Sequence, residues 1–280
     1  MTVTAMKFSY ITLFPNLIEN YLEDALLKKA AAKKLLQFNV IDLRNYTDNK
    51  YKSVDDSPYG GGDGMILRPD IADKCFNDIY KDPIFSADST LRIYLSPQGK
   101  PLTQTVVLDL MKYDHLVLLS GRYGGIDQRI MNHHIDMEIS MGDFVLSGGE
   151  LAALALTEAI SRFVPGVLGD EHSVIQDSFH QGLLEAPQFT KPQLWGDQTV
   201  PAVLTSGHHE KIETWKHHMA FLITWKKRKD LFFAKSGKIL VSSFLKTHLQ
   251  FLQDVTPADL EATGLTVEDF KNYQSEIKDL

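Results

Sequence analysis

The chain has 280 residues, of which 44% are hydrophobic and 10% aromatic, so it can bury a sizeable core and is not disordered as a whole. A formal net charge of −7 argues mildly against a protein whose whole surface binds nucleic acid. The single cysteine, Cys75, excludes an internal disulfide framework and a cysteine-based zinc site.

The sequence predicts a protein with no membrane segment. No apolar run approaches the roughly 18 residues that a spanning helix needs. The N-terminal residues 1–15 alternate like a strand and contain no small-residue cleavage site, so they do not form a signal peptide. We therefore expect a cytoplasmic protein in a reducing compartment.

Short strand-like runs alternate with helical patterns through the first part of the chain. Strands are expected at 8–13, 38–43, 91–95, 116–119 and 137–140. Helices are expected at 17–34, 70–80, 102–112, 127–133 and 150–163. Because such alternation places helices over the faces of a sheet, the pattern predicts an α/β domain with a mostly parallel sheet.

A Pro165-Gly166 pair ends the last of these helices, and residues 166–182 have no clear period. We expect this segment to be an interdomain linker. The chain beyond it is mainly helical, with a first helix expected at 210–218. The predicted organisation is a domain at 1–165, the linker at 166–182 and a smaller helical domain at 183–280.

Charge is unevenly spread over the second domain. Residues 207–250 contain nine Lys and Arg against three acids, with Trp215 and Trp225 among them. This composition fits a phosphate-contacting surface as well as it fits a solvated helical face over core tryptophans. From residue 251 onward seven acids face two lysines. In that tail Thr256 and Thr266 each precede an aspartate by three residues, which predicts two helix starts.

Three glycine clusters stand out, at 60–64, at 121–125 and at 142 with 148–149. The first lies in a segment, 44–69, that is too long for a simple connector and is expected to be a functional lid. Glycine lets backbone groups approach a flat ligand such as adenine. The string 147–150, Ser-Gly-Gly-Glu, also fits a capping box, which places a helix start directly after the third cluster.

Several familiar sites are missing from the sequence. There is no Walker-type phosphate loop, and no G-x-G-x-x-G follows the first strand. The histidine pairs 133–134, 208–209 and 217–218 are adjacent, so the two rings of each pair are expected to point in different directions on a helix. We therefore expect no metal site.

Eight strings in order along residues 8–225 resemble those of one enzyme family: Phe14-Pro15, Val54-Asp-Asp-Ser-Pro-Tyr-Gly-Gly-Gly62, Ile93-Tyr-Leu-Ser-Pro-Gln-Gly99, Gly121-Arg-Tyr123, Met141-Gly-Asp-Phe-Val-Leu-Ser-Gly-Gly-Glu-Leu151, Ser161-Arg-Phe-Val-Pro-Gly-Val-Leu168, Asp177-Ser-Phe179 and Val200-Pro-Ala-Val-Leu-Thr-Ser-Gly207. The chain is similar to the bacterial tRNA (guanine-N1)-methyltransferases. Those enzymes methylate guanosine 37, the nucleotide that follows the anticodon.

The resemblance implies a SPOUT-type fold, in which a parallel sheet carries a deep trefoil knot next to a smaller, mainly helical domain. It also implies a homodimer that binds tRNA and holds S-adenosyl-L-methionine, bent, in the knotted loops. The matching cofactor positions are Tyr94, Leu95, Ser96, Pro97, Gly121, Tyr123, Met141, Gly142, Asp143, Phe144, Val145, Leu146, Gly148 and Gly149.

The resemblance also assigns two catalytic residues. Guanine N1 becomes a good nucleophile only after it loses its proton, and the matching general base is Asp177. Negative charge then builds toward guanine O6, where the matching cation is Arg162. From the residues alone, Asp177 could instead cap a helix beginning at Ser178, and Arg162 could compensate a helix dipole.

Two positions depart from the family pattern. Gly124 replaces a glutamate of the second glycine cluster, so a site contact is expected to be lost or supplied by a neighbour such as Asp127. Asp63 replaces a proline in the lid. The tail beyond about residue 232 matches the family poorly. The alternatives are a SPOUT methyltransferase of another RNA guanosine and a non-catalytic RNA-binding homologue.

Overall fold

The computed structural model describes residues 5–23, 25–83, 85–122, 124–169, 177–239 and 242–278. The chain divides into two compact units, residues 1–171 and residues 172–280, which we call the N-terminal and the C-terminal unit. The predicted linker spans this boundary, and its residues 170–176 lie outside the described ranges. Within those ranges, no helix combines the length and apolar character needed to cross a membrane.

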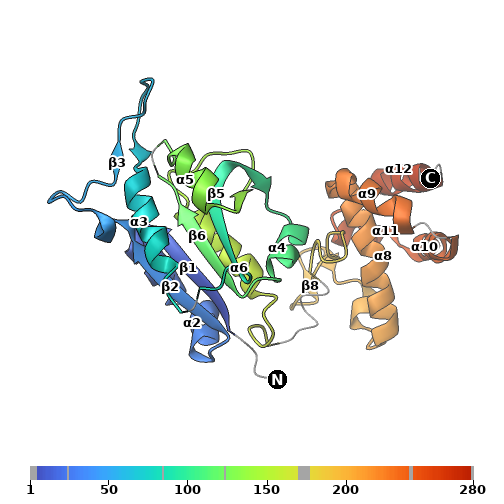
Figure 1. Ribbon diagram of the computed structural model, residues 1–280. Coiled ribbons are helices and arrows are strands. Elements are labelled where there is room, and N and C mark those ends of the chain that lie inside the picture. Colours follow the sequence, from blue (N-terminus) through green and yellow to red (C-terminus); the bar gives the residue numbers. More distant parts are fainter. Residues whose placement is uncertain are drawn as a thin grey trace. The chain divides into compact units, whose positions relative to one another are not determined.

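A five-stranded parallel sheet forms the centre of the N-terminal unit (Figure 1). In spatial order its strands are β2 (Leu36–Asp42), β1 (Met6–Thr12), β6 (His115–Ser120), β5 (Thr90–Pro101) and β7 (Met137–Ser140). Every pairing between them is parallel. The prediction of a mostly parallel α/β sheet is therefore confirmed.

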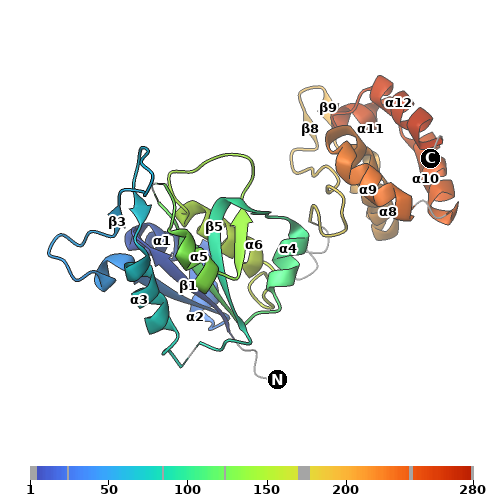
Figure 2. The same ribbon diagram turned by 45° about the horizontal axis from the view of Figure 1, so that its top comes forward.

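Helices cover both faces of this sheet (Figures 1 and 2). Side chains alternate along β1, so that Phe8 and Tyr10 join one buried cluster and Ile11 joins the other. The first cluster includes side chains of α1 (Pro15–Leu22), α2 (Ala25–Ala32), α4 (Gln104–Leu110) and α6 (Glu150–Ser161). The second includes those of α3 (Pro69–Ile79) and α5 (Gln128–His134).

One predicted helix is wrong as a single element. The expected helix at 17–34 is two helices, because α1 ends at Leu22 and α2 begins at Ala25. Ala25 has a φ of 47°, in the left-handed region that a right-handed helix does not contain. The hydrophobic pattern continues across this break, which is why periodicity alone did not reveal it.

Strand β5 is longer than predicted and irregular at the end that matters for the site. Its pairing with β7 is interrupted, since Leu95 and Lys100 both pair with Ile139. Residues 96–99 therefore leave the ladder as a bulge. Gly99 passes so close to β7 that a Cβ there would lie 2.5 Å from the carbonyl carbon of Glu138. The bulge presents its side chains at the carboxyl end of the sheet.

The glycine-rich segment after β2 contains a 3₁₀ turn (Leu43–Tyr46) and an antiparallel pair, β3 (Asp55–Asp56) with β4 (Ile66–Leu67). Between these strands the chain projects away from the sheet (Figure 1). Gly60, Gly61, Gly62 and Gly64 all have positive φ values. These are conformations that residues with a Cβ rarely adopt, which explains the glycine density here.

The described part of the C-terminal unit is mainly helical. It contains a two-stranded hairpin, β8 (Leu194–Trp195) with β9 (Gln198–Thr199), a 3₁₀ turn (Ala202–Thr205) and the helices α8 (His209–Lys227), α9 (Lys229–Ile239), α10 (Ser242–Asp254), α11 (Pro257–Ala262) and α12 (Val267–Lys278).

Both helix starts predicted in the acidic tail are confirmed. Thr256 accepts a hydrogen bond from the Asp259 amide at 3.1 Å, and the Asp259 carboxylate accepts one from the Thr256 amide at 3.1 Å. Thr266 and Asp269 exchange the same two bonds, each at 3.0 Å, at the start of α12. These capping boxes depend only on residues three apart, so the sequence was sufficient to predict them.

Candidate functional site

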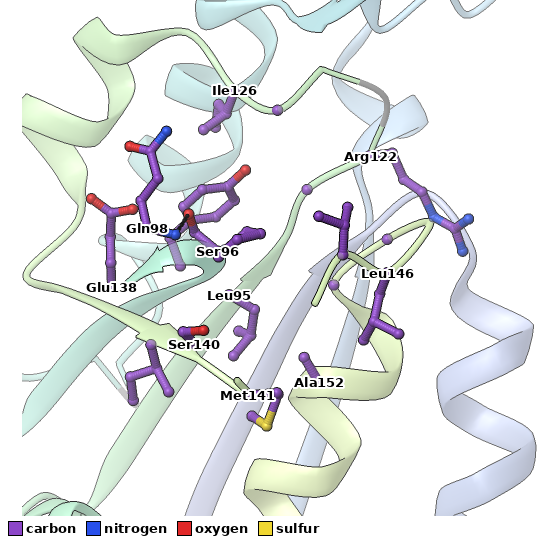
Figure 3. Close-up of a pocket in the computed structure, with 18 of the residues that line it drawn as sticks. Leu95, Ser96, Gln98, Arg122, Ile126, Glu138, Ser140, Met141, Leu146 and Ala152 are labelled. Atoms are coloured by element: carbon purple, nitrogen blue, oxygen red, sulfur yellow. Dashed lines mark hydrogen bonds between the residues drawn. The ribbon is translucent and has the colours of Figure 1, made fainter. Parts of the chain in front are cut away.

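A cavity of about 350 Å³ lies where the bulged part of β5 meets the loops that follow β6 and β7 (Figure 3). Carboxyl ends of neighbouring parallel strands lie at one edge of a sheet, and this is the usual position of ligand sites in open α/β folds. The size is within the range of small-molecule sites. All of the lining residues belong to the N-terminal unit.

The structure brings together most of the predicted cofactor positions. Those that line the cavity are Tyr94, Leu95, Ser96, Pro97, Gly121, Met141, Phe144, Val145, Leu146, Gly148 and Gly149. Gly142 and Asp143 belong to the same third loop but do not line the cavity. Tyr123 lies outside the described residues.

Close contact between the loops explains several of these glycines. A Cβ at Gly121 would collide with the Tyr94 hydroxyl, and one at Gly149 would lie 2.9 Å from the Cα of Ser120. The amide of Gly149 donates a hydrogen bond to the carbonyl of Gly121 at 2.9 Å. The third loop thereby packs on the second backbone against backbone, while the Tyr94 side chain of β5 packs directly on Gly121.

The predicted capping box at 147–150 is wrong, although the helix start after the third loop is confirmed. The N-cap of α6 is Gly149, and Glu150 is the first helical residue. The Glu150 side chain is buried and points elsewhere: it accepts hydrogen bonds from Thr12 Oγ1 at 2.9 Å and from Arg122 Nε at 3.0 Å. Its partners lie on β1 and in the second glycine loop.

The sequence analysis did not identify Arg122, a residue that connects the second glycine loop to the helix start after the third. Its guanidinium lies over the Phe14 ring, 4.2 Å from the ring centre, and pairs with Glu150. A Cβ at Gly148 would lie 2.5 Å from Arg122 Cδ and from a carboxylate oxygen of Glu150. The glycine therefore leaves the space through which the arginine passes. Arg122 also lines the cavity, so the Arg122–Glu150 pair fixes part of the cavity wall.

Arg162 and Asp177, the predicted catalytic residues, belong to different units. Arg162 is exposed at the C-cap of α6, and its amide hydrogen-bonds to the carbonyl of Glu158 at 3.4 Å. Asp177 precedes a turn in which its carbonyl accepts a hydrogen bond from the His180 amide at 3.4 Å. No helix of the described residues starts at Ser178, so the N-cap interpretation of Asp177 is wrong.

Asp177 lines a second, smaller cavity of about 110 Å³, which lies within the C-terminal unit. Lys216 and His217 of α8 line it together with Glu185 and Glu213. The surroundings of Asp177 therefore contain both cationic and anionic side chains.

Comparison with known proteins decides the family. The family model described as tRNA (Guanine-1)-methyltransferase TrmD matches residues 6–234, more than half of the chain. The chain belongs to this family.

Curated relatives agree with the tRNA (guanine-1)-methyltransferase assignment. A tRNA (guanine-N(1)-)-methyltransferase of Staphylococcus carnosus is 44% identical over 226 residues, which cover 81% of this chain and 90% of the relative. One of Staphylococcus haemolyticus is 43% identical with the same coverage. One of Staphylococcus aureus strain JH9 is 44% identical over 233 residues, again covering 81% of this chain and 90% of the relative.

The structure accounts for the glycine that departs from the family pattern. The amide of Gly124 donates to the Met65 carbonyl at 2.8 Å, and the Leu67 amide donates to the Gly125 carbonyl at 3.1 Å. A Cβ at Gly124 would lie 3.1 Å from the Met65 oxygen. In this member of the tRNA (guanine-1)-methyltransferases, the base of the projecting β3–β4 segment therefore packs closely on the second glycine loop, and a side chain at position 124 would require a small shift there.

Asp127, named above as a neighbour that could supply the contact of the missing glutamate, is engaged elsewhere. It caps α5, where its carboxylate accepts hydrogen bonds from the Arg129 amide at 2.9 Å and from Arg129 Nη2 at 2.7 Å. The arginine lowers the pKa of Asp127. Asp127 also does not line the cavity.

One group of side chains in the described ranges has the composition of a metal site. Ligand atoms of Asp73, His133 and His134 lie within 4.8 Å of one another, so the expectation that the adjacent histidines point apart is wrong for this pair. A chain of hydrogen bonds already uses both nitrogens of His134. Arg92 donates a hydrogen bond to the Tyr80 hydroxyl at 2.7 Å. That hydroxyl then donates to Nδ1 of His134 at 2.7 Å. Nε2 of His134 donates to Asp73 at 2.8 Å.

In the part of the basic segment whose side chains the structure describes, exposed cations lie over a buried aromatic core; these cations are Lys211, Lys226, Lys227, Arg228 and Lys229. Trp215 and Trp225 are buried, so they are core residues and do not contribute to a phosphate-contacting surface. Trp195 on β8 is exposed. Beyond residue 234, where the tRNA (guanine-1)-methyltransferase match ends, α12 pairs its acids with this segment: Lys226 binds Asp269, and Lys229 binds Glu276 at 3.1 Å.

Proposed function

We propose that this chain transfers the methyl group of S-adenosyl-L-methionine to N1 of guanosine 37 in tRNA. Methylation of a tRNA guanine at N1 follows from membership of the family and from the relatives' names. The methyl donor and the position in the tRNA are the parts that this proposal adds.

The observation that supports the donor most strongly is the cavity itself. Backbone groups and small or apolar side chains form most of its wall, with a few polar side chains such as Ser96 and Gln98. This composition suits a nucleoside, whose base presents a flat apolar face and a polar edge. Gly121, Gly148 and Gly149 cannot carry side chains without collisions, so backbone forms the wall at these positions.

Residues 94–97, Gly121 and the third loop, 141–149, would hold S-adenosyl-L-methionine. When bound, the donor supplies an electrophilic methyl group on a positively charged sulfur. The protein's own contribution is to bind the donor with its loops, which Arg122 and Glu150 hold together. Exclusion of water by these loops strengthens every electrostatic interaction within the site.

Asp177 and Arg162 act on the guanine. The Asp177 carboxylate takes the N1 proton, so that the N1 electron pair is available for the bond to the methyl carbon. Arg162 stabilises the negative charge that develops on O6. A planar guanidinium suits this role because it can present two parallel N–H groups.

We further propose that the active form is a homodimer in the cytoplasm, with the knot characteristic of SPOUT enzymes in the domain at 1–165. The segment 166–182 then links it to the tRNA-binding domain at 183–280. Exposed apolar side chains in the N-terminal unit support a partner subunit. Phe14, Leu17 and Tyr21 lie on or next to α1, and Leu151 at the start of α6 is 59% exposed. Tyr21 donates to Glu158 of α6 at 3.2 Å, so α1 and α6 are neighbours.

The central test is methyl transfer to tRNA transcripts by wild-type enzyme and by Asp177→Asn. Asparagine keeps the size of the side chain but cannot accept the N1 proton, so the rate should fall by roughly 10²–10⁴-fold. Binding of S-adenosyl-L-methionine and thermal stability should stay close to wild type. Near-normal transfer by Asp177→Asn at saturating donor would refute the assignment of the base.

Three further measurements test the rest of the proposal. Arg162→Lys keeps the charge but loses the planar fork, so a fall in rate with unchanged donor binding is expected. A transcript with guanosine 37 replaced should accept no methyl group; methylation of that transcript would favour another RNA guanosine. Sedimentation of an active monomer would contradict the dimer.

A further inference from the structure

The cavity contains one carboxylate to which no role has yet been given. Glu138 is on β7, where it pairs in register with Tyr94 of β5, and its side chain lines the cavity. It lies beside the β5 bulge, with Gln98 and Ser96 as its labelled neighbours in Figure 3. The residue is half-buried, so its surroundings are less polar than bulk water.

The charge of Glu138 is not balanced by the protein. Arg122 and Glu138 are the charged side chains among the described residues that line the cavity. The Arg122 guanidinium already pairs with Glu150 at 3.0 Å. Within the described ranges, no hydrogen bond or ion pair involves the Glu138 carboxylate. The charge of Glu138 also affects a neighbouring side chain. The pKa of Tyr94 is raised first by burial and then by the negative charge of Glu138.

A half-buried carboxylate without a protein partner is stabilised when a cation binds beside it. The proposed donor carries two positive charges, the sulfonium and the α-ammonium. The demethylated product, S-adenosylhomocysteine, keeps the ammonium but has a neutral thioether in place of the sulfonium.

We propose that Glu138 binds the cationic end of S-adenosyl-L-methionine and so makes the affinity of the cavity depend on the positive charge of its ligand. This inference rests on the proposed function, because it names the part of the donor that a particular residue recognises. Glu138 thereby provides the anionic contact that the glycine at position 124 cannot provide.

A calorimetric titration of wild type and Glu138→Gln with three ligands tests this inference. The ligands are S-adenosyl-L-methionine, S-adenosylhomocysteine and 5′-methylthioadenosine, which carry the sulfonium and ammonium, the ammonium alone and neither charge. Glutamine keeps the shape and the hydrogen-bonding carbonyl of the side chain but removes its charge. Glu19→Gln, an exposed change on α1 outside the cavity, is the matched control.

We expect Glu138→Gln to weaken binding of S-adenosyl-L-methionine by about 10-fold or more, the usual worth of a hydrogen bond to a charged group. Binding of 5′-methylthioadenosine should stay within about twofold of wild type, which also shows that the cavity is intact. A loss for S-adenosyl-L-methionine alone assigns the contact to the sulfonium, and equal losses for it and for the product assign it to the ammonium. Glu19→Gln should bind all three like wild type.

Two results would overturn the inference: unchanged affinity for S-adenosyl-L-methionine, or equal weakening of all three ligands. Wild-type protein that binds none of the three would refute the proposed donor as well. These outcomes are distinguishable, because failure of the inference leaves wild-type binding in place whereas failure of the donor assignment abolishes it.

Discussion

In the N-terminal unit the buried carboxylate of Glu150 is next to the guanidinium of Arg122, whereas in the C-terminal unit two buried histidines hydrogen-bond to each other. His218 and His248 approach at 2.7 Å through their Nδ1 atoms, and His248 Nε2 is 2.6 Å from the Tyr273 hydroxyl. An ion pair can keep its charges when buried, but a pair of imidazoles can share this bond only if the accepting nitrogen carries no proton.

The pKa values of the two histidines follow first from burial and then from their histidine neighbours. Burial, and then His217, lowers the pKa of His218 to about 4. Burial, and then the neighbouring histidines, lowers that of His248 to about 3. Burial is thus the main reason why these histidines stay neutral, and the neighbouring imidazoles add to its effect. Each unit should therefore respond to a different perturbation.

The largest effect is expected from removing the carboxylate of the ion pair. Glu150→Ala leaves Arg122 and the Thr12 hydroxyl without their acceptor and creates a small cavity at the start of α6. Breaking a buried pair typically costs 3–5 kcal/mol. Arg122 keeps 21% of its side-chain surface exposed, which favours the lower end, about 3 kcal/mol. Urea unfolding followed by far-ultraviolet circular dichroism measures this change.

The tryptophans provide an internal comparison in the same experiment. Trp195, Trp215 and Trp225 are the three tryptophans of the chain and all belong to the C-terminal unit. Their fluorescence transition should therefore keep its wild-type midpoint in Glu150→Ala. Glu158→Ala on the same helix is the control, and it should cost less than about 1 kcal/mol because its bond with Tyr21 is exposed. If both variants cost the same, the pair does not stabilise the unit.

The histidine pair makes the C-terminal unit sensitive to acid. The pKa of each histidine is lower in the folded protein than its ordinary value of about 6.5, so the unfolded state binds more protons below that pH. Stability is therefore complete above about pH 6.5 and falls as the pH decreases toward the folded values of about 4 and 3. Between pH 6.5 and 5 the loss should be roughly 1.5 kcal/mol for each histidine.

Tryptophan fluorescence in urea at a series of pH values measures this dependence for the C-terminal unit alone. His248→Gln cannot gain a charge, so its stability should fall less steeply over the same range, even if it starts lower. Equal slopes for wild type and His248→Gln would show that other groups cause the acid sensitivity. The range stays above the ordinary pKa of aspartate and glutamate, which keeps carboxylate protonation small.

The polar contacts described above also show which structural features could be predicted from the sequence and which could not. The five sheet strands and the Thr-x-x-Asp helix starts were predictable because alternation and capping depend on residues within a few positions of one another. The true partners of Glu150 were not, since Thr12 is 138 positions away and Arg122 is 28 positions away. A local motif, the capping box, was a plausible alternative that the tertiary contacts overrode.

The residues of the candidate site likewise include some that the sequence could predict and some that it could not. The glycine loops were visible in the sequence, and the resemblance identified which loops meet. Glu138 was missed because a glutamate in a short strand resembles any exposed acid until its register beside Tyr94 is known. The break between α1 and α2 was missed for another reason: the φ of Ala25 is unusual for alanine, and no glycine or proline marks it.

The smallest effect is expected at the exposed ion pair between α8 and α12. Lys226 is the first cause of the lowered pKa of Asp269, about 2, and the Thr266 amide is the second. The Lys226 side chain is 43% exposed, so solvent screening and the entropy of a long side chain offset most of the attraction. Lys226→Ala should therefore cost less than about 1 kcal/mol in the fluorescence transition, and added salt should remove the difference from wild type.

Thr266→Ala, which deletes the cap but keeps both charges, should cost about 1 kcal/mol and remain insensitive to salt. A loss of 2 kcal/mol or more in Lys226→Ala that persists at high salt would mean that this exposed pair behaves like the buried pair of Glu150 and Arg122.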